Sequence, residues 1–306
     1  MSVVQQNDLF GFIANKINQI TNNQLCDRFM IETKARYFQV DAFTDRPFGG
    51  NPAAVCFMST SHKEDFYFSI VKEMNLLSEM SIVEKIEEGN YKIRWFSQVK
   101  EVPLCGHATL ATAHIIFNHM GYQGSEIVFQ SKSGPLYAEK TTEGIRMDFP
   151  QNKPYSVDPP LEALSSLGIN KWVNVVYSDT NQKLVVHLEN ERLVLAVKPD
   201  FDKLLAADNP LGWRGVVVTS RGSGKYDYVA RYFAPLMGVN EDPVTGSAQT
   251  VLAPYWGDIL AKRKLWGYQA SERGGSFYVE LIDNRVKLTG QAVTILGGKL
   301  KNLKLF

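Results

Sequence analysis

Apolar and polar residues alternate along most of this chain in short runs, a pattern typical of β-strands. β-branched and aromatic residues fill these runs, and Gly, Pro, Asn and Asp separate them. In the first half, the pattern predicts strands at residues 37–43, 53–58, 81–84, 91–97, 126–130, 136–139 and 145–149. In the second half, it predicts strands at residues 172–177, 184–188, 193–197, 215–219, 228–233, 268–271, 276–281, 285–289 and 293–296.

Two longer segments have small and apolar residues on every side, which is typical of buried helices. They are residues 109–117 and 249–256, one in each half of the chain, and shorter helices are predicted at 63–74 and 161–167. We therefore expect an α+β fold of two pseudo-symmetric lobes. Each lobe would be an antiparallel sheet or barrel wrapped round a central helix.

The two predicted lobes meet at a cluster of prolines between residues 150 and 160. We expect an N-terminal lobe at 36–150 and a C-terminal lobe at 151–306, with the last strand free to return to the first lobe. Residues 1–35 stand apart, because their apolar residues recur at the spacing of one amphipathic helix. The pattern leaves open whether this extension packs on the body, contacts a second subunit or remains partly disordered.

One eight-residue pattern occurs twice, directly before each of the two apolar segments. Residues 101–108 and 241–248 both read Glu-x-Pro-x-x-Gly-x-Ala. Proline favours extended backbone before it and fits the first turn of a helix, so each octet predicts a strand-to-helix elbow. A helix that begins near Gly106 or Gly246 presents free N–H groups and the positive end of its dipole, which suits a carboxylate or an oxyanion. We expect these first and second elbows to face each other across a cleft.

Several side chains at the elbows are candidates for chemistry on a molecule bound between them. His107 would lie at a helix start, where a neutral imidazole is favoured, and Asp242 could orient a substrate amine. Glu79 lies between apolar neighbours, which suits a carboxyl that both accepts and donates a proton. The other elbow side chains expected to converge on the ligand are Cys105, Thr245 and Ser247.

Composition excludes several classes of partner. Lys and Arg number 33 against 32 acidic residues, so the net charge of +1 provides no basic surface for nucleic acid or an anionic membrane. No apolar run approaches the roughly 20 residues of a membrane helix, and the first residues do not resemble a secretory signal. Three cysteines in 306 residues form no disulfide framework, which favours a reducing, cytoplasmic location.

Familiar cofactor motifs are also missing from the sequence. His107, His114 and His119 lack metal-ligand spacing, and no Cys-x-x-Cys or His-x-x-x-His is present. Residues 221–225 lack the spacing of a phosphate loop, and no Gly-x-Ser-x-Gly hydrolase motif occurs. We therefore expect no metal and no cofactor, which leaves proton transfer by side chains.

The chain resembles the PhzF family of phenazine-biosynthesis-like isomerases, which have the diaminopimelate epimerase fold. The resemblance covers roughly residues 36–306, and both elbows carry it most specifically. It is closest to the branch that includes the vertebrate MAWD-binding protein. The matching stretches are residues 41–44, 50–55, 73–76, 103–111, 231–235, 241–248, 273–275 and 290–293.

The resemblance implies a homodimeric, cofactor-independent isomerase that shifts a proton on a small carboxylate-bearing substrate in the cleft between lobes. In phenazine producers the substrate is a dihydro-hydroxyanthranilate. The catalytic residues of the family fall on Glu79, His107 and Asp242. Its substrate-binding positions fall on Gly106, Gly246 and Ser247, and we add Cys105, Thr245 and Asn51 to the expected substrate-binding set.

Departures from the family pattern keep two alternatives open. An extra leucine precedes Ser78 and Glu79, and altered neighbours follow, which would suit a non-catalytic protein-binding scaffold of the MAWD-binding type. Cys105 beside His107 would suit a thiol enzyme. Epimerase relatives use a thiol at each elbow, but Thr245 holds the second position here, so racemisation by two thiols is excluded.

Overall fold

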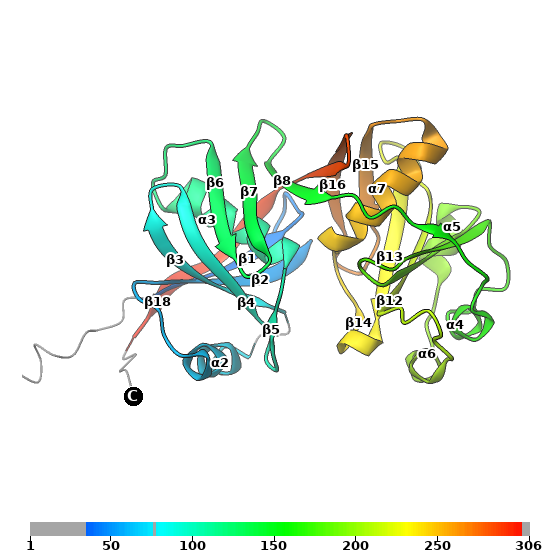
Figure 1. Ribbon diagram of the computed structural model, residues 1–306, viewed down its shortest axis with the longest axis horizontal. Coiled ribbons are helices and arrows are strands. Elements are labelled where there is room, and N and C mark those ends of the chain that lie inside the picture. The colour runs from blue at the N-terminus through cyan, green and yellow to red at the C-terminus, as the bar shows by residue number, and fades with distance from the viewer. Residues whose placement is uncertain (1–34, 76–77, 302–306) are drawn as a thin grey trace, which may run out of the picture.

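The computed structural model describes residues 35–75 and 78–301 as a mixed α+β protein that is mostly sheet (Figure 1). The predicted helix of the N-terminal extension lies outside these residues. Within them, no helix is both long enough and apolar enough to cross a membrane.

The first half of the chain supplies strands β1 to β8 and two helices. The predicted helix at 63–74 is confirmed as α2, and the apolar segment at 109–117 is confirmed as part of α3. The elements are β1 (Ala35–Ala42), β2 (Asn51–Met58), α2 (Glu64–Glu73), β3 (Met80–Glu87), β4 (Asn90–Phe96), β5 (Glu101–Val102), α3 (Gly106–His119), β6 (Glu126–Ser131), β7 (Gly134–Lys140) and β8 (Ile145–Pro150).

The second half supplies the remaining strands and four further α-helices. Its apolar segment at 249–256 is confirmed as part of α7. The elements are β9 (Tyr155–Ser156), α4 (Leu161–Ser166), β10 (Asn174–Ser178), β11 (Lys183–His187), α5 (Glu191–Ala196), α6 (Phe201–Ala206), β12 (Gly215–Arg221), β13 (Tyr228–Ala234), the 3-10 turn η1 (Pro235–Met237), β14 (Val239–Glu241), α7 (Gly246–Leu260), β15 (Lys264–Gln269), β16 (Gly275–Ile282), β17 (Arg285–Gly290) and β18 (Ala292–Leu300).

The two halves use the same order and sense of strand pairing. From β1 to β8, the pairs β1·β2, β2·β3, β3·β4, β4·β6, β6·β7 and β7·β8 run antiparallel, parallel, antiparallel, parallel, antiparallel and antiparallel. From β10 to β17, the pairs β10·β11, β11·β12, β12·β13, β13·β15, β15·β16 and β16·β17 repeat that series. The short strands β5 and β14 precede α3 and α7 at matching places in the two series.

Two crossings tie the halves together. β8 pairs with β17 over the whole length of both strands. The last strand, β18, returns to pair with β1 of the first half. The short strand β9, which follows β8, pairs with β10 within the second half. Figure 1 shows β18, in red, running back from the side of α7 to the side of α3.

The core surrounds α3 and α7, as their composition predicts. Ten residues of α3 and ten of α7 are buried, so neither helix keeps a fully solvated face. Strand residues that face these helices form one continuous apolar cluster with them, including Val55, Trp95, Val217 and Leu288. A second cluster packs α4, α5 and α6 against the outer face of β10 to β13.

One predicted strand is wrong. Residues 193–196 belong to helix α5, not to a strand, and Val197 is the residue that follows the helix; the Asn190 side chain caps its start by accepting a hydrogen bond from the Leu193 N–H. Only Val194 of this helix is buried, and Leu195 is half exposed. Within the helix, the apolar run therefore places only the Val194 side chain in the core. The strand predicted at 268–271 also begins earlier, since β15 spans Lys264–Gln269.

Candidate active site

The two elbows meet, as the sequence predicts. α3 begins at Gly106 and α7 at Gly246, each after an extended N-cap residue, Cys105 or Thr245. A Cβ atom placed on Gly106 would lie 3.8 Å from the Cα of Gly246. Two helix N-termini from opposite halves therefore lie close to each other.

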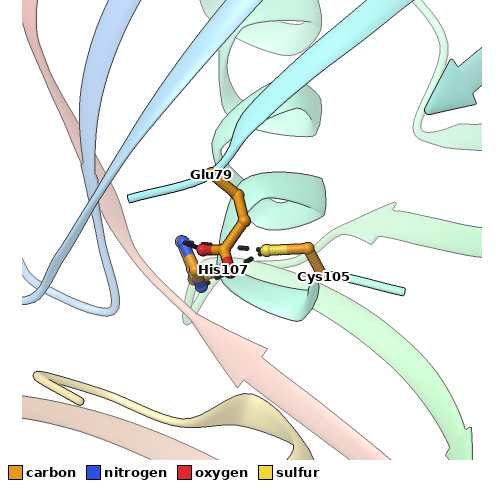
Figure 2. A group of neighbouring side chains, drawn as sticks. All are labelled: Glu79, Cys105 and His107. Atoms are coloured by element: carbon orange, nitrogen blue, oxygen red, sulfur yellow. Dashed lines mark hydrogen bonds and ion pairs between the residues drawn. The ribbon is translucent and has the colours of Figure 1, made fainter. Parts of the chain in front are cut away.

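Glu79, Cys105 and His107 form a cluster beside the first elbow (Figure 2). The Glu79 Oε2 lies 3.4 Å from the His107 Nε2, and the Glu79 side chain is 30% exposed. The Cys105 Sγ lies 3.5 Å from His107 Nδ1 and 3.7 Å from Nε2. Glu79 precedes β3 and is fixed there because its carbonyl oxygen accepts from the Ala54 N–H at 3.3 Å. The carboxyl is thus held near the imidazole while part of it faces solvent.

Ser78 belongs to the same cluster, although it is not among the site residues expected from the sequence. Its Oγ lies 3.0 Å from the His107 Nε2 and donates to the Glu79 Oε2 at 3.3 Å. A hydroxyl at this point can hold the carboxylate and the imidazole at a fixed separation. The signal that could have found it is its place directly before Glu79.

Asp242 lies at the second elbow, as Cys105 and His107 lie at the first. Its Oδ1 accepts from the Asn51 Nδ2 at 2.8 Å, and its Oδ2 accepts a short bond from the Thr245 hydroxyl. Asn51 also donates to the Val244 carbonyl at 2.8 Å, so a residue of β2 positions the second elbow. Burial raises the pKa of the Asp242 carboxyl, which the His107 charge and these hydrogen bonds oppose.

Gln269 of β15 holds the second elbow from behind. Its Oε1 accepts from the Thr245 N–H at 2.8 Å, and its Nε2 donates to the Asp242 carbonyl at 2.6 Å. Its side chain is buried, so these bonds replace contacts with water. No local pattern in the sequence indicates this role, because Gln269 lies 24 residues from Thr245.

Ser247 differs from the other expected site residues because it is exposed. It lies in the first turn of α7, and its carbonyl accepts from the Asn181 Nδ2 at 3.1 Å and from the Thr250 hydroxyl at 2.8 Å. Its N–H and hydroxyl therefore lie where a ligand could reach the start of α7.

The Cys105 thiol is poorly suited to act as a nucleophile. Burial raises its pKa well above the usual range, and the negative charges of Glu79 and Asp242 raise it further. A reactive cysteine needs the opposite surroundings, with cations that favour the thiolate. The geometry therefore argues against the thiol-enzyme alternative.

A metal ion could reach one set of ligand atoms here. Glu79, Cys105 and His107 each offer one atom, and these atoms lie within 4.8 Å of one another. Spacing in the sequence could not reveal this set, because Glu79 comes from a different element. Binding would require loss of the thiol proton, which the buried, negative surroundings of Cys105 oppose.

Comparison with known proteins identifies the family. Residues 40–298 match the sequence pattern of the phenazine biosynthesis-like (PhzC-PhzF) family. The chain belongs to this family. An uncharacterized isomerase of Pseudomonas aeruginosa is 44% identical over 266 residues, which cover 87% of this chain and 98% of that protein.

Animal proteins and solved structures agree with this PhzF assignment. The mouse phenazine biosynthesis-like domain-containing protein 1 is 38% identical over 87% of this chain and 99% of its own length. The crystal structure of a PhzF family protein from Enterococcus faecalis matches with a TM-score of 0.81 at 38% identity, covering 87% of this chain and 99% of that one. The family resemblance read from the elbows is therefore confirmed.

Proposed function

We propose that this PhzF family member is a cofactor-independent isomerase that moves a proton on a small carboxylate-bearing substrate bound between the two lobes. The observation that carries this proposal is the position of the Glu79 carboxyl. It lies beside His107, next to a pair of helix N-termini that approach each other from opposite halves of the chain. Relatives that are named as isomerases support the same class of reaction.

The helix starts would bind the substrate carboxylate. The free N–H groups near Gly106 and Gly246, with the N–H and hydroxyl of Ser247, are suited to an anion. Thr245 and Asn51 would fix the second elbow through their bonds to Asp242. Cys105 would line the space between the elbows as a neutral thiol.

Glu79 would carry the proton. As a carboxylate it would take a proton from a carbon of the substrate, and the electron pair left behind would spread into the neighbouring unsaturated system. The protonated Glu79 would then return the proton to a different carbon, so that atoms and charge balance. His107 and Ser78 would hold the carboxyl in position, and Asp242 would orient a polar group of the substrate.

Exchange of substrate protons with deuterated water tests this role. Aromatic and amino carboxylates would be incubated with the protein in D₂O, and loss of carbon-bound protons would be followed by ¹H NMR. Glu79→Gln keeps the shape and hydrogen bonding but removes the base, so the exchange rate should fall by about 10² to 10⁴. Glu87→Gln, at an exposed carboxyl of β3, is the matched control and should leave the rate unchanged.

Exchange by the Glu79→Gln protein at the rate of the unmodified protein would disprove the role of Glu79. The scaffold alternative makes a different prediction in a thermal-shift screen with the same carboxylates. An isomerase site should be stabilised by the compounds that it binds, whereas a pure scaffold should keep its unfolding temperature.

The wider assignments are part of the same proposal. Two pseudo-symmetric lobes, with the site between them, are supported by the repeated series of strand pairs, and by β9 and β18, which follow β8 and β17 and pair with β10 and β1. A cytoplasmic location is supported by Cys56 and Cys105, which are both free and buried. A homodimer is expected from the family resemblance alone.

A further inference from the structure

Lys183 is a buried ammonium group that forms no direct ion pair among the described residues, although the Asp242 carboxyl is close enough to act on its charge. The residue is only 6% exposed, and its Nζ donates to the Tyr232 hydroxyl at 3.1 Å while lying 4.2 Å above the centre of that ring. No ion pair of the described chain includes it. A buried charge with only a neutral partner is costly, so its surroundings invite a negative group.

The fold builds this arrangement around a glycine. Lys183 begins β11 and Tyr232 lies on β13, with β12 between them. A Cβ atom on Gly215 of β12 would lie 2.5 Å from the Tyr232 hydroxyl oxygen, so only glycine leaves room for the ring to cross to Lys183. The pair is therefore part of the packing and not a chance contact of two surface side chains.

Two further polar atoms nearby lack partners. Ser178 lies opposite Lys183 in the pairing of β10 with β11, is 1% exposed, and its Oγ has no hydrogen-bond partner in the described structure. The Oδ1 of Asn181, in the turn between these strands, is likewise buried and unpartnered. Unsatisfied buried groups of this kind are rare in folded proteins and call for an occupant.

This polar group faces the start of α7. Val176 and Val185, two residues along β10 and β11 from Ser178 and Lys183, belong to the core that surrounds α7, and alternate strand residues share a face. The Asn181 Nδ2 donates to the Ser247 carbonyl and to the Thr250 hydroxyl in the first turns of α7. Lys183 is also close enough to Asp242 to interact with its charge.

We propose that Lys183 and Ser178 form a subsite for a second acidic group of the substrate, beside the first turn of α7. This inference rests on the proposed function, in which the elbows bind the first carboxylate. The substrate would then be a small diacid. The Lys183 ammonium and the Ser178 hydroxyl would both donate to the second acidic group, and Tyr232 would support the ammonium from the side.

Binding of matched acids tests the subsite without any turnover. Succinate, glutarate and adipate would each be titrated calorimetrically beside its monoamide, which has nearly the same shape but one charge fewer. The unmodified protein should bind at least one diacid roughly tenfold or more tightly than its monoamide, as expected for one charge-assisted hydrogen bond. Equal affinity within every pair, or no binding of any diacid at millimolar concentration, would overturn the proposal.

Variants assign the preference to particular residues. Lys183→Met should abolish the preference for the diacid and leave the affinity for the monoamide unchanged, and Ser178→Ala should weaken the preference. Arg214→Met is the matched control, because Arg214 is exposed and also close enough to interact with the Lys183 charge. A preference that survives in Lys183→Met, or that disappears in Arg214→Met alone, would overturn the assignment. If Lys183→Met does not fold, the comparison of diacid with monoamide in the unmodified protein, together with Ser178→Ala, still tests whether this subsite binds a second acidic group.

The pH dependence gives a second measurement. Burial lowers the pKa of Lys183 to about 8, the Asp242 charge raises it and the Arg214 charge lowers it, while Tyr232 presents a neutral hydroxyl. The ammonium loses its proton above this value, so the preference for the diacid should shrink as the pH rises from about 7 to about 9. Glu79→Gln should keep the preference, so loss of deuterium exchange in that variant and loss of diacid preference report on the two proposals separately.

Discussion

Cys105 is the residue at which the isomerase and thiol-enzyme hypotheses make opposite predictions. Its pKa is raised by burial and by two neighbouring carboxyls, so the thiol stays protonated near neutral pH. Cys105→Ser should therefore change the rate of deuterium exchange by no more than about threefold, well below the loss expected for a catalytic base. The same NMR assay measures it, and a loss of several orders of magnitude would revive the thiol mechanism.

Among single residues, the sequence identified most of the candidate active site but not the residues that hold it in place. Glu79, His107 and Asp242 could be selected because each lies in or beside a recognisable motif. Ser78 could have been selected with Glu79, which it directly precedes, but Gln269 and Lys183 could not, because their importance comes from partners 24 and 49 residues away. Only the folded chain brings such partners within hydrogen-bond distance.

The elements that matter most are the two helix starts. Gly106 has ordinary backbone angles, and a Cβ there would meet only the Gly246 Cα, at a normal contact distance. Gly106→Ala should therefore fold and should be as stable as the unmodified protein or more stable by about 0.5–1 kcal/mol, since alanine favours helices. The methyl group would fill the approach between the elbows, so binding of carboxylates should weaken.

Thermal unfolding and calorimetric titration of Gly106→Ala measure these two effects. Gly50→Ala is a contrasting variant, because Gly50 has φ +60° and its added Cβ would lie 2.1 Å from the Ala42 carbonyl oxygen. That variant should lose stability by about 1–3 kcal/mol or more. Unchanged carboxylate affinity in Gly106→Ala would show that the ligand does not bind between the helix starts.

Element by element, prediction was strongest where one pattern was long and consistent. The buried helices α3 and α7 were found because their residues are apolar on all sides, which no exposed helix tolerates. Helix α5 was misread as a strand because six residues are too few to separate the two periods. The Asn190 side chain and carbonyl both accept hydrogen bonds from N–H groups at the start of this helix.

The molecule as a whole is held together partly by β18, which returns to pack near α3. The His114 Nε2 on α3 contacts the Thr294 hydroxyl of β18 at 3.0 Å. Burial, together with the charge of the neighbouring His119, lowers the pKa of His114 to about 4. Protonation of His114 therefore opposes folding.

Stability should fall on acidification for this reason. The unfolded chain binds the His114 proton near pH 6.5, but the folded protein binds it only near pH 4. The contribution of neutral His114 to the free energy of unfolding is therefore fully present above pH 6.5 and is lost as the pH falls toward 4. The loss should be on the order of 1–3 kcal/mol, reduced from the full value because the ring is partly exposed. Denaturant unfolding of the unmodified protein and of His114→Gln, from pH 7 to 4, measures it. Parallel curves for the two proteins would contradict the assignment, since other groups titrate in both.

The sequence by itself determined the α+β class, the two buried helices and the repeated elbows, because these depend on local periodicity and on proline and glycine geometry. It also carried the family resemblance, because the elbow motifs are short and specific. The tertiary structure decided the rest: the pairing of β8 with β17 between the halves, the distance of Glu79 from His107, and the buried pairing of Lys183 with Tyr232. These features join residues far apart in the chain, and their energies depend on burial and distance, which no local pattern encodes.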